Sequence, residues 1–481
     1  MEIKAGFIPF LPDEEISYER FTVGEEGKDT LLVPALTTEQ LQYTAEQVRE
    51  NTQKVLKKYT LTEIINVIDQ AIHLMLNRTS GLRQQAEVWL PKITGYDEEI
   101  IRLSFTTFLK TFRKKELQKF LTEDFGNWTV LDDFQPRTKG GFSKAIAPDL
   151  LIHIWAGNVP GIPIWSFISG LLVKAGSIGK VSSDEPLFAG LFARAIKEID
   201  PQLATCFAIV WWKGGDEEKE RLMGEMSEIV IGYGHNASLQ SIKTRLPITT
   251  RFVVYGSKIS FGIISRESLQ ADKAVQVAKD AAYDVMRFDQ QGCYSPQLFF
   301  VQQSGKTSPQ DFAKMIAGEL AQLEVRYPRQ QLSMEESAVF SQWKQSEELK
   351  GFSDDAYEVY SDPNGRWTVV FSGNDGELAT PLNRSIKIIP FDDINEVKKR
   401  LAPIKSYLQT VGLACTPEEL FDWASALAEV GVTRIASLGK MTLLEPGWHH
   451  DGRFNLLELV NFVDIDASAE MYSEQFAPYK D

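Results

Sequence analysis

Between about residue 144 and residue 255, short apolar runs alternate with stretches of helical periodicity. The apolar runs, which we expect to form strands, are residues 150–155, 177–181, 205–211, 228–231 and 252–255. The helical stretches between them are residues 162–173, 186–199, 216–226 and 237–245. This alternation predicts right-handed βαβ units and a mostly parallel sheet with helices on both faces. Such a sheet binds ligands beyond the carboxyl ends of its strands, so the candidate site lies in the loops there.

The segments on either side of this region have their own patterns. Before it the chain is largely helical, because the capping boxes Thr37-x-x-Gln40 and Thr60-x-x-Glu63 each precede an amphipathic run. A third helix is expected from about residue 97 to residue 121. After Cys293 we expect a second α/β region, which ends near residue 444. Its expected elements are strands at 298–301, 367–371 and 386–389, a turn at 373–376 and a helix at 392–408.

Composition excludes several classes of function. The 481-residue chain is 43% hydrophobic, which is enough to bury substantial cores. Its 51 Lys and Arg residues against 66 Asp and Glu residues give a net charge of −15. A field of this sign disfavours nucleic-acid binding. The most basic short segment, residues 113–115, is expected to be the solvated end of a helix.

We expect neither a membrane span nor a signal peptide. The longest apolar stretch, residues 150–173, is interrupted by Gly157, Pro160, Gly161 and Pro163. The first residues of the chain are followed by acidic residues rather than by a long apolar run. Three widely spaced cysteines form no disulfide framework and suggest a reducing compartment, so we expect a cytoplasmic protein.

Cys293 is the candidate nucleophile. It follows Gly292 and precedes Ser295-Pro296, between an expected helix at 268–286 and an expected strand at 298–301. This context predicts a tight turn from which the sulfur meets a ligand. A free thiol has a pKa of about 8.5, so catalysis requires the turn and the bound cofactor to favour the thiolate.

The alternative to a nucleophile, for any lone cysteine, is an inert thiol buried as a small apolar side chain. Cys206, within an apolar run, and Cys415 fit that description.

Two loops, residues 156–161 and 232–236, follow expected strands, and neither contains the Gly-x-Gly-x-x-Gly dinucleotide fingerprint. His235, in the second loop, is a candidate neighbour of Cys293 or of a ligand bound at the strand ends, and its role is open. Adjacent histidines point in different directions, and only Asp451 accompanies His449 and His450. We therefore expect no metal site there, and a substrate-loop or subunit-contact role instead.

Four features in chain order resemble the aldehyde dehydrogenase superfamily. They are Asn158-Val159-Pro160, Lys180 after a strand, the glycine-rich strand end at 232–234, and Gln291-Gly292-Cys293. More narrowly, residues 290–297 and the segment Gly447-Trp448-His449-His450-Asp451-Gly452 resemble the fatty-acyl reductase family of bacterial luminescence, the LuxC family. The resemblance spans about residue 144 to the C-terminus.

The resemblance implies an α/β, aldehyde-dehydrogenase-like fold. A helical N-terminal region and a Rossmann-type dinucleotide-binding domain would occupy residues 1–254, and an α/β catalytic domain residues 255–445. The C-terminal segment, residues 446–481, would return to the cofactor domain or form a subunit contact.

It also implies residue roles. Cys293 would be the nucleophile, and Asn158 with the Cys293 backbone N–H would stabilise the oxyanion. The implied cofactor-binding residues are Lys180, Ser183, Gly232 and Gly234. From the residues alone, Asn158 also suits a turn and Lys180 a solvated strand end.

The cofactor implied is NADPH. NAD-preferring relatives carry a Glu three residues after the cofactor Lys, where this chain has Ser183. A neutral hydroxyl does not repel a 2′-phosphate, although Asp184 and Glu185 follow immediately.

The activity implied is reduction of a long-chain fatty acyl-CoA or acylated protein to the aldehyde through a cysteine acyl-enzyme. Implied partners are an acyl-protein synthetase, a thioesterase and further copies of the chain. Apolar residues within 162–172 are candidates for lining an acyl tunnel, although packing of a helix on its sheet accounts for most of them. Two alternatives stay open: a short-chain CoA-acylating aldehyde dehydrogenase, and a catalytically silent binding protein of the same fold.

Two positions depart from the superfamily pattern. Val254 stands where hydrolytic relatives carry the Glu that activates water, so the acyl-enzyme is expected to resist hydrolysis. Thr380 stands where a ribose-binding Glu is expected, with Glu377 out of register.

Overall fold

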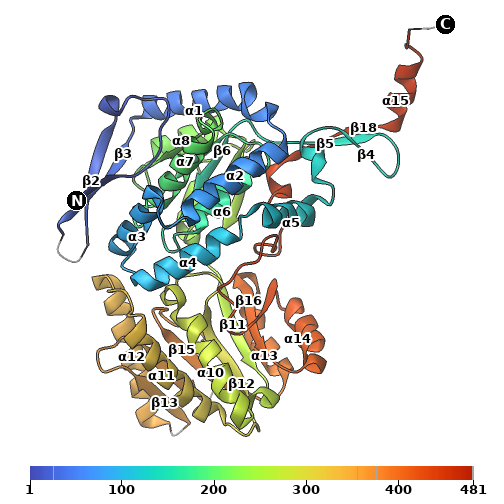
Figure 1. Cartoon of the computed structure of the whole chain (residues 1–481). Helices are drawn as coiled ribbons and strands as arrows, with labels where there is room; N and C mark the ends of the chain where they lie inside the picture. The colour runs from blue at the N-terminus through green and yellow to red at the C-terminus, as the bar shows by residue number, and fades with distance from the viewer. Residues whose placement is uncertain (25–26, 355, 374–377, 479–481) are drawn as a thin grey trace.

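The computed structural model describes residues 1–24, 27–354, 356–373 and 378–478, which form two lobes and a projecting C-terminal arm (Figure 1). The first lobe contains a five-stranded, fully parallel sheet of order β10-β9-β6-β7-β8. Its strands are β6 (Leu151–Ile154), β7 (Ser177–Lys180), β8 (Phe207–Val210), β9 (Ile229–Tyr233) and β10 (Arg251–Tyr255). The intervening helices are α6 (Ile162–Leu172), α7 (Phe188–Ile199), α8 (Glu217–Met226) and α9 (Asn236–Lys243). These elements confirm the predicted βαβ alternation.

The strand order of the first sheet reverses between β6 and β9. From β6 the chain passes to β7 and β8 on one side of the sheet, then returns to β9 and β10 on the other side. A ligand site is expected where the order reverses, beyond the carboxyl ends of the strands. In register, Ile154 of β6 faces Lys180 of β7 on one side and Gly232 of β9 on the other.

The helices before β6 pack onto this lobe. They are α1 (Thr38–Lys54), α2 (Leu61–Leu76), α3 (Gly81–Thr94), α4 (Glu98–Lys110) and α5 (Lys114–Phe125). Both predicted capping boxes are present. The Thr37 and Thr60 side chains each accept the backbone N–H of the residue three positions later, and the side chain of that later residue accepts the threonine backbone N–H. Helices α2 to α7 contribute to one apolar core, which therefore joins the helical region to the sheet.

The predicted helix at 97–121 is wrong, because two helices, α4 and α5, occupy that stretch. Arg113 separates them in an extended conformation and forms a salt bridge of 2.6 Å with Asp69 of α2. Residues 113–115 thus begin a helix rather than end one. Helix α3 was not predicted; it starts with a glycine and contains Pro91, which masks its helical pattern.

The second lobe contains a seven-stranded sheet of order β13-β14-β15-β12-β11-β16-β17, in which only the edge strand β13 is antiparallel to its neighbour. Its strands are β11 (Ile259–Ile264), β12 (Pro296–Gln302), β13 (Tyr357–Ser361), β14 (Thr368–Ser372), β15 (Ser385–Phe391), β16 (Leu408–Ala414) and β17 (Arg434–Ser437). Its helices are α10 (Ala271–Met286), α11 (Pro309–Arg326), α12 (Met334–Ser353), α13 (Ile394–Leu401) and α14 (Pro417–Glu429). Two apolar cores fill its two faces, one with α10 and α11 and the other with α13 and α14.

Three details of this lobe differ from the expectation or lie outside the described residues. The helix expected at 392–408 ends at Leu401 and continues as a 3₁₀ turn. The helix expected at 268–286 begins at Ala271. The expected turn at 373–376 lies, after residue 373, outside the described residues.

Two smaller sheets complete the fold, one mixed and one antiparallel. Near the N-terminus, β3 (Asp29–Ala35) pairs with β1 (Glu2–Lys4) and β2 (Ser17–Val23). In the arm, β5 (Phe142–Ile146) lies between β4 (Gln135–Pro136) and β18 (Asn461–Ile465), and α15 (Ala467–Glu474) follows (Figure 1). Among the helices of the described residues, none combines the length and apolar character that a membrane crossing requires.

Replacement of Gly179 by Ala is expected to destabilise the first lobe. A Cβ atom at Gly179 of β7 would overlap the buried indole of Trp155, and such overpacking costs about 1–3 kcal/mol. The matched control is Gly318→Ala in α11, where a Cβ atom meets nothing within 4 Å and helix propensity improves. Thermal unfolding should show a lower midpoint for Gly179→Ala and an unchanged or higher one for Gly318→Ala; equal midpoints would contradict this packing.

Candidate active site

The segment before Cys293 is held in a left-handed conformation. Phe288, Asp289 and Gln290 have φ angles of 49°, 49° and 65°. Such angles cost non-glycine residues about 1–2 kcal/mol each. The run begins directly after Arg287, the residue that follows α10, and it lets the chain reverse toward β12 within a few residues. Cys293 therefore lies in a strained turn, and surrounding contacts must stabilise it.

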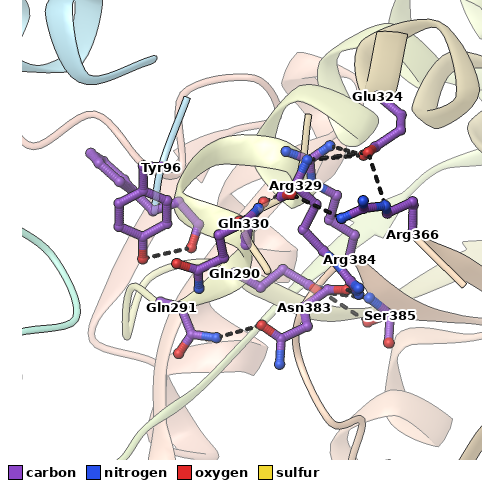
Figure 2. Close-up of polar contacts among 12 residues, drawn as sticks. Tyr96, Gln290, Gln291, Glu324, Arg329, Gln330, Arg366, Asn383, Arg384 and Ser385 are labelled. Atoms are coloured by element: carbon purple, nitrogen blue, oxygen red, sulfur yellow. Dashed lines mark hydrogen bonds and ion pairs between the residues drawn. The ribbon is translucent and has the colours of Figure 1, made fainter. Parts of the chain in front are cut away.

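A second left-handed run lies against the first. Leu382, Asn383 and Arg384, with φ angles of 62°, 56° and 63°, precede β15. The Asn383 backbone N–H donates to the Asp289 carbonyl at 3.0 Å. The Gln291 side-chain amide donates to Asn383 Oδ1 at 2.9 Å (Figure 2). The two strained runs therefore stabilise each other.

The Gln290 side chain holds the Cys293 turn in place through three hydrogen bonds. Its Nε2 donates to the carbonyls of Pro296 and Ser385 at 2.7 and 3.0 Å, and its Oε1 accepts the Ser385 N–H at 2.8 Å. Gln290 is buried, so each of these bonds replaces hydration that the partner groups have lost. The start of β12, the start of β15 and the nucleophile turn are thus joined by one side chain.

Asp289 and Arg384 form a buried salt bridge behind the turn. Arg384 Nε donates to Asp289 Oδ1 at 2.7 Å, and both side chains are at most 3% exposed. Arg384 Nη1 also donates to Glu324 of α11 at 2.6 Å. Burial raises the pKa of Asp289, and the Arg384 guanidinium opposes that shift. Figure 2 shows Arg329, whose Nη1 donates to the Asn383 carbonyl at 3.2 Å, on the same side of the cluster.

Cys293 lies at the wall of a large apolar pocket. The buried Ser260 hydroxyl donates to the Cys293 carbonyl at 2.7 Å, which fixes the backbone, and the side chain is half-buried. The empty space in and around the pocket, open solvent included, is about 950 Å³. Its walls come from α3 and α4, the 159–162 segment, α6 and the segment between β17 and β18. The lining includes Leu90, Ile101, Phe105, Phe108, Ile162, Trp165, Leu443, Leu444 and Trp448. A lining of this apolar character fits an alkyl chain.

Of the predicted tunnel residues, Ile162 and Trp165 line this pocket. Phe167, Ile168 and Leu171 lie in the core, as expected if this helix simply packs on its sheet.

Burial raises the pKa of the Cys293 thiol to about 11. The side-chain amide of Gln409 acts in the opposite direction. The same amide donates to Asp451 Oδ1 at 2.6 Å, and the nearby Asp451 carboxylate further disfavours the thiolate. Burial and Asp451 thus favour the neutral thiol, and the expected activation of Cys293 by the turn together with a bound cofactor stays a prediction.

The Asn158 loop contacts the nucleophile turn. Asn158 Nδ2 donates to the Gln291 carbonyl at 2.6 Å. The Tyr96 hydroxyl donates to the Asn158 carbonyl at 2.8 Å and lies 3.4 Å from the Phe288 carbonyl. Figure 2 shows Tyr96 beside this turn. The predicted oxyanion donor therefore lies near Cys293, with one amide hydrogen used in positioning.

The predicted cofactor residues lie at the carboxyl edge of the first sheet. Lys180 ends β7 half-buried, and burial lowers its pKa. Ser183 is exposed and accepts a hydrogen bond of 3.0 Å from Trp211 Nε1. A Cβ atom at Gly232 would lie 2.8 Å from Leu239 and 2.9 Å from Phe252, so this glycine permits close packing. A Cβ atom at Gly234 would meet nothing within 4 Å, so open space remains there for a ligand.

The histidines fall into separate places. His235 is exposed at the start of α9 and is not among the residues that line the Cys293 pocket. His450 lines that pocket and stacks on Tyr255, with ring centroids 4.1 Å apart. Burial lowers the pKa of His450 to about 4, so its imidazole is neutral at pH 7. His449 packs edge-on against Phe454. Over the described residues, no three His, Cys, Asp or Glu side chains gather in a way that would hold a metal ion.

Sequence reasoning missed the residues that support the turn. Asp289, Gln290, Asn383 and Arg384 carry no periodic signal, and neither left-handed run contains a glycine. Gln290 lies within the stretch 290–297 that carries the family resemblance, but the resemblance assigned it no role.

A sequence model described as acyl-CoA reductase (LuxC) matches residues 56–462. The chain belongs to this family. It is therefore an enzyme that reduces acyl thioesters. Among curated relatives, the long-chain acyl-protein thioester reductase of Aliivibrio fischeri is 25% identical over 449 residues, covering 88% of this chain and 89% of that protein. The protein of the same name from Photorhabdus laumondii is 24% identical over 424 residues, covering 87% and 85%.

Solved structures show that this LuxC-family chain has the aldehyde dehydrogenase fold. Aldehyde dehydrogenase 21 from Physcomitrella patens matches with a TM-score of 0.74 at 13% identity, covering 97% of this chain and 98% of that one. An NAD-dependent benzaldehyde dehydrogenase from Corynebacterium glutamicum matches with a TM-score of 0.72 at 13% identity, covering 96% and 97%. The fold resemblance stated from the sequence motifs is confirmed.

The raised pKa of Cys293 predicts slow alkylation at neutral pH. Only the thiolate reacts, so the rate with iodoacetamide should rise about tenfold for each pH unit between 7 and 10. It should stay below the rate of a free thiol, whose pKa is about 8.5, across that range. Peptide mass spectrometry after timed alkylation reports on Cys293 alone. Reaction at pH 7 faster than that of a free thiol would contradict the raised pKa.

Replacement of Gln290 by Leu is expected to disorganise the turn. The variant would remove the hydrogen bonds to the Pro296 and Ser385 carbonyls, at about 1–3 kcal/mol each, and one of the two bonds made by the Ser385 N–H, which keeps the Leu382 carbonyl. We expect a lower midpoint of thermal unfolding and a loss of reductase activity of at least about tenfold. Gln303→Leu, at an exposed position just after β12, is the matched control. Wild-type activity in Gln290→Leu would show that these three bonds do not position Cys293.

Proposed function

We propose that this protein reduces a long-chain acyl thioester, carried by a protein or by CoA, to the aldehyde through an acyl-enzyme on Cys293. The observation that carries the proposal is the position of Cys293 on the wall of a pocket lined mainly by aliphatic and aromatic side chains. The relatives named above are long-chain acyl-protein thioester reductases, which favours a protein-borne acyl group.

Cys293 begins the reaction by attacking the thioester carbonyl carbon after loss of its proton. The remaining N–H of the Asn158 amide and the Cys293 backbone N–H stabilise the oxyanion that forms. The bond to the leaving sulfur then breaks, and the free thiol departs with a proton. The acyl group remains on Cys293 Sγ with its alkyl chain in the pocket.

The residues at the carboxyl edge of the first sheet fit a nicotinamide dinucleotide. Open space above Gly234, which follows β9 where the strand order reverses, and the Lys180 ammonium provide room and a positive charge for it. When bound, this cofactor supplies the hydride that converts the cysteine thioester to the aldehyde. We assign residues 1–254 to its binding, residues 255–445 to the chemistry of Cys293, and residues 446–481 to the arm and its return to the first lobe.

Val254 limits hydrolysis of the acyl-enzyme. It is exposed on β10 and does not line the Cys293 pocket, and an aliphatic side chain accepts no proton. Without a carboxylate at this position, the thioester on Cys293 persists until it is reduced. Thr380, at the position of the second missing Glu, has a buried hydroxyl that forms no hydrogen bond within the described part of the chain, and Glu377 lies outside that part.

The C-terminal arm supports assembly with further copies of the chain. β18 leaves one edge unpaired within the described residues, and Phe462 and Val463 on it are 49% and 47% exposed. Exposed apolar strand edges pair with other chains unless they are covered. A protein-borne acyl group also requires an acyl-protein synthetase and a thioesterase to supply it, and we propose these as functional partners.

Cys293→Ala is expected to abolish reduction of tetradecanoyl-CoA while Cys206→Ala and Cys415→Ala stay active. Cys206 is fully buried and Cys415 packs against an apolar core, so neither reaches the pocket. Oxidation of NADPH, followed by its absorbance, measures the activity. Reduction by Cys293→Ala would disprove the nucleophile. Faster turnover of acetyl-CoA than of tetradecanoyl-CoA by the wild type would instead identify a short-chain enzyme.

The cofactor is expected to be NADPH. Ser183 is neutral and exposed beside Lys180, so a 2′-phosphate meets no repulsion from it. Ser183→Glu should lower the ratio of kcat/KM for NADPH to that for NADH by about tenfold or more, through like-charge repulsion. Ser183→Gln is the matched neutral control. A wild-type preference for NADH, or an unchanged ratio in Ser183→Glu, would refute this assignment.

A further inference from the structure

Arg287 is a charged side chain in the wall of the apolar pocket. It directly follows α10, is 6% exposed, and lines the same pocket as Cys293. Its one hydrogen bond among the described residues runs from Nη2 to the Ser104 hydroxyl at 3.1 Å. Its Nε is buried without a partner. Guanidinium groups in protein interiors are normally paired with carboxylates or phosphates.

No carboxylate among the described residues forms a salt bridge with Arg287. Asp284, one helical turn earlier, is the acidic group whose charge interacts with Arg287; burial raises the pKa of Asp284 to about 7, and the Arg287 guanidinium opposes that shift. Asp284 Oδ2 accepts the Gly439 N–H at 2.6 Å, and its buried Oδ1 has no hydrogen-bond partner among the described residues. The rings of Phe288 and Tyr283 lie 5.5 and 6.0 Å from the guanidinium carbon, and they provide only a weak cation–π environment. Arg287 therefore has no salt-bridge partner among the described residues, and Asp284 offsets its charge only in part.

Other polar groups without partners belong to the same wall. Thr442 is 4% exposed, and its hydroxyl oxygen forms no hydrogen bond within the described residues. The Trp448 Nε1 is also buried without an acceptor. Thr442 and Trp448 both line the pocket with Arg287. Three buried donors without acceptors in the wall of one mainly apolar pocket favour a ligand that brings oxygen atoms to this wall.

We propose that Arg287, with Thr442 and Trp448, forms a subsite that binds a carboxylate in the acyl pocket. This inference rests on the proposed function for the identity of the pocket. The carboxylate has two possible sources, the far end of an acyl chain derived from a dicarboxylic acid, or a free fatty acid. Both place an alkyl chain on the apolar wall and an anion at the guanidinium, which suits a bidentate contact.

Binding is tested by calorimetry on Cys293→Ala protein, which requires no turnover. Decanoate and decanedioate should bind at least about tenfold more tightly than decan-1-ol, as expected for hydrogen bonds to a charged donor. Arg287→Met should remove that difference, Thr442→Val should reduce it, and Arg221→Met, at an exposed site on α8, should preserve it. Because Thr442→Val changes no charge and little volume, it tests the subsite even if Arg287→Met fails to fold. Equal affinities for decanoate and decan-1-ol in the unsubstituted pocket, or carboxylate binding that survives both variants, would overturn the proposal.

Turnover distinguishes the two sources. If the substrate carries the carboxylate, the wild type reduces the CoA monothioester of decanedioate faster than decanoyl-CoA, and Arg287→Met reverses this order. If the ligand is a free fatty acid, decanoate inhibits the wild type more strongly than Arg287→Met. If no thioester is reduced while Arg287-dependent binding persists, the proposed function fails and the carboxylate subsite stands.

Discussion

The salt bridge between Asp289 and Arg384 is the interaction on which the geometry around Cys293 depends. Both charges are almost fully buried, so each requires the other. Asp289 lies in the first left-handed run and Arg384 in the second. The bridge therefore joins two backbone segments that are unfavourable alone and that extend from different elements, α10 and β15. Glu324 of α11 completes the charge balance from outside the turn.

The strained turn has a direct chemical consequence. Because the chain reverses within a few residues, Cys293 lies in the wall of the pocket. Helix α4, the 159–162 segment and Trp448 form other parts of that wall. The Asn158 amide reaches the turn through the Gln291 carbonyl. The nucleophile, the predicted oxyanion donor and the acyl pocket are thus assembled by contacts between segments far apart in the sequence. The turn supplies position, whereas burial alone leaves the thiol protonated at pH 7.

Local sequence patterns predicted most of the fold. The strands of the first sheet and the two capping boxes depend on near neighbours, so apolar periodicity and Thr-x-x-Gln or Thr-x-x-Glu spacing were sufficient. The single helix expected at 97–121 was wrong because Arg113 leaves the helical conformation for a partner 44 residues away. The left-handed runs could not be predicted, since long-range contacts, and not glycine, stabilise them. A role for Arg287 and Thr442 could likewise not be predicted from the sequence, because it depends on the pocket that both residues line.

A crystal structure of the protein after reaction with tetradecanoyl-CoA, without nucleotide, tests the central claim most directly. The account predicts a thioester on Cys293 Sγ, with the alkyl chain lying against α4 and Trp448 and with the runs at 288–290 and 382–384 unchanged. An acyl group on Cys206 or Cys415, or an alkyl chain that leaves Cys293 by a path outside this pocket, would contradict it.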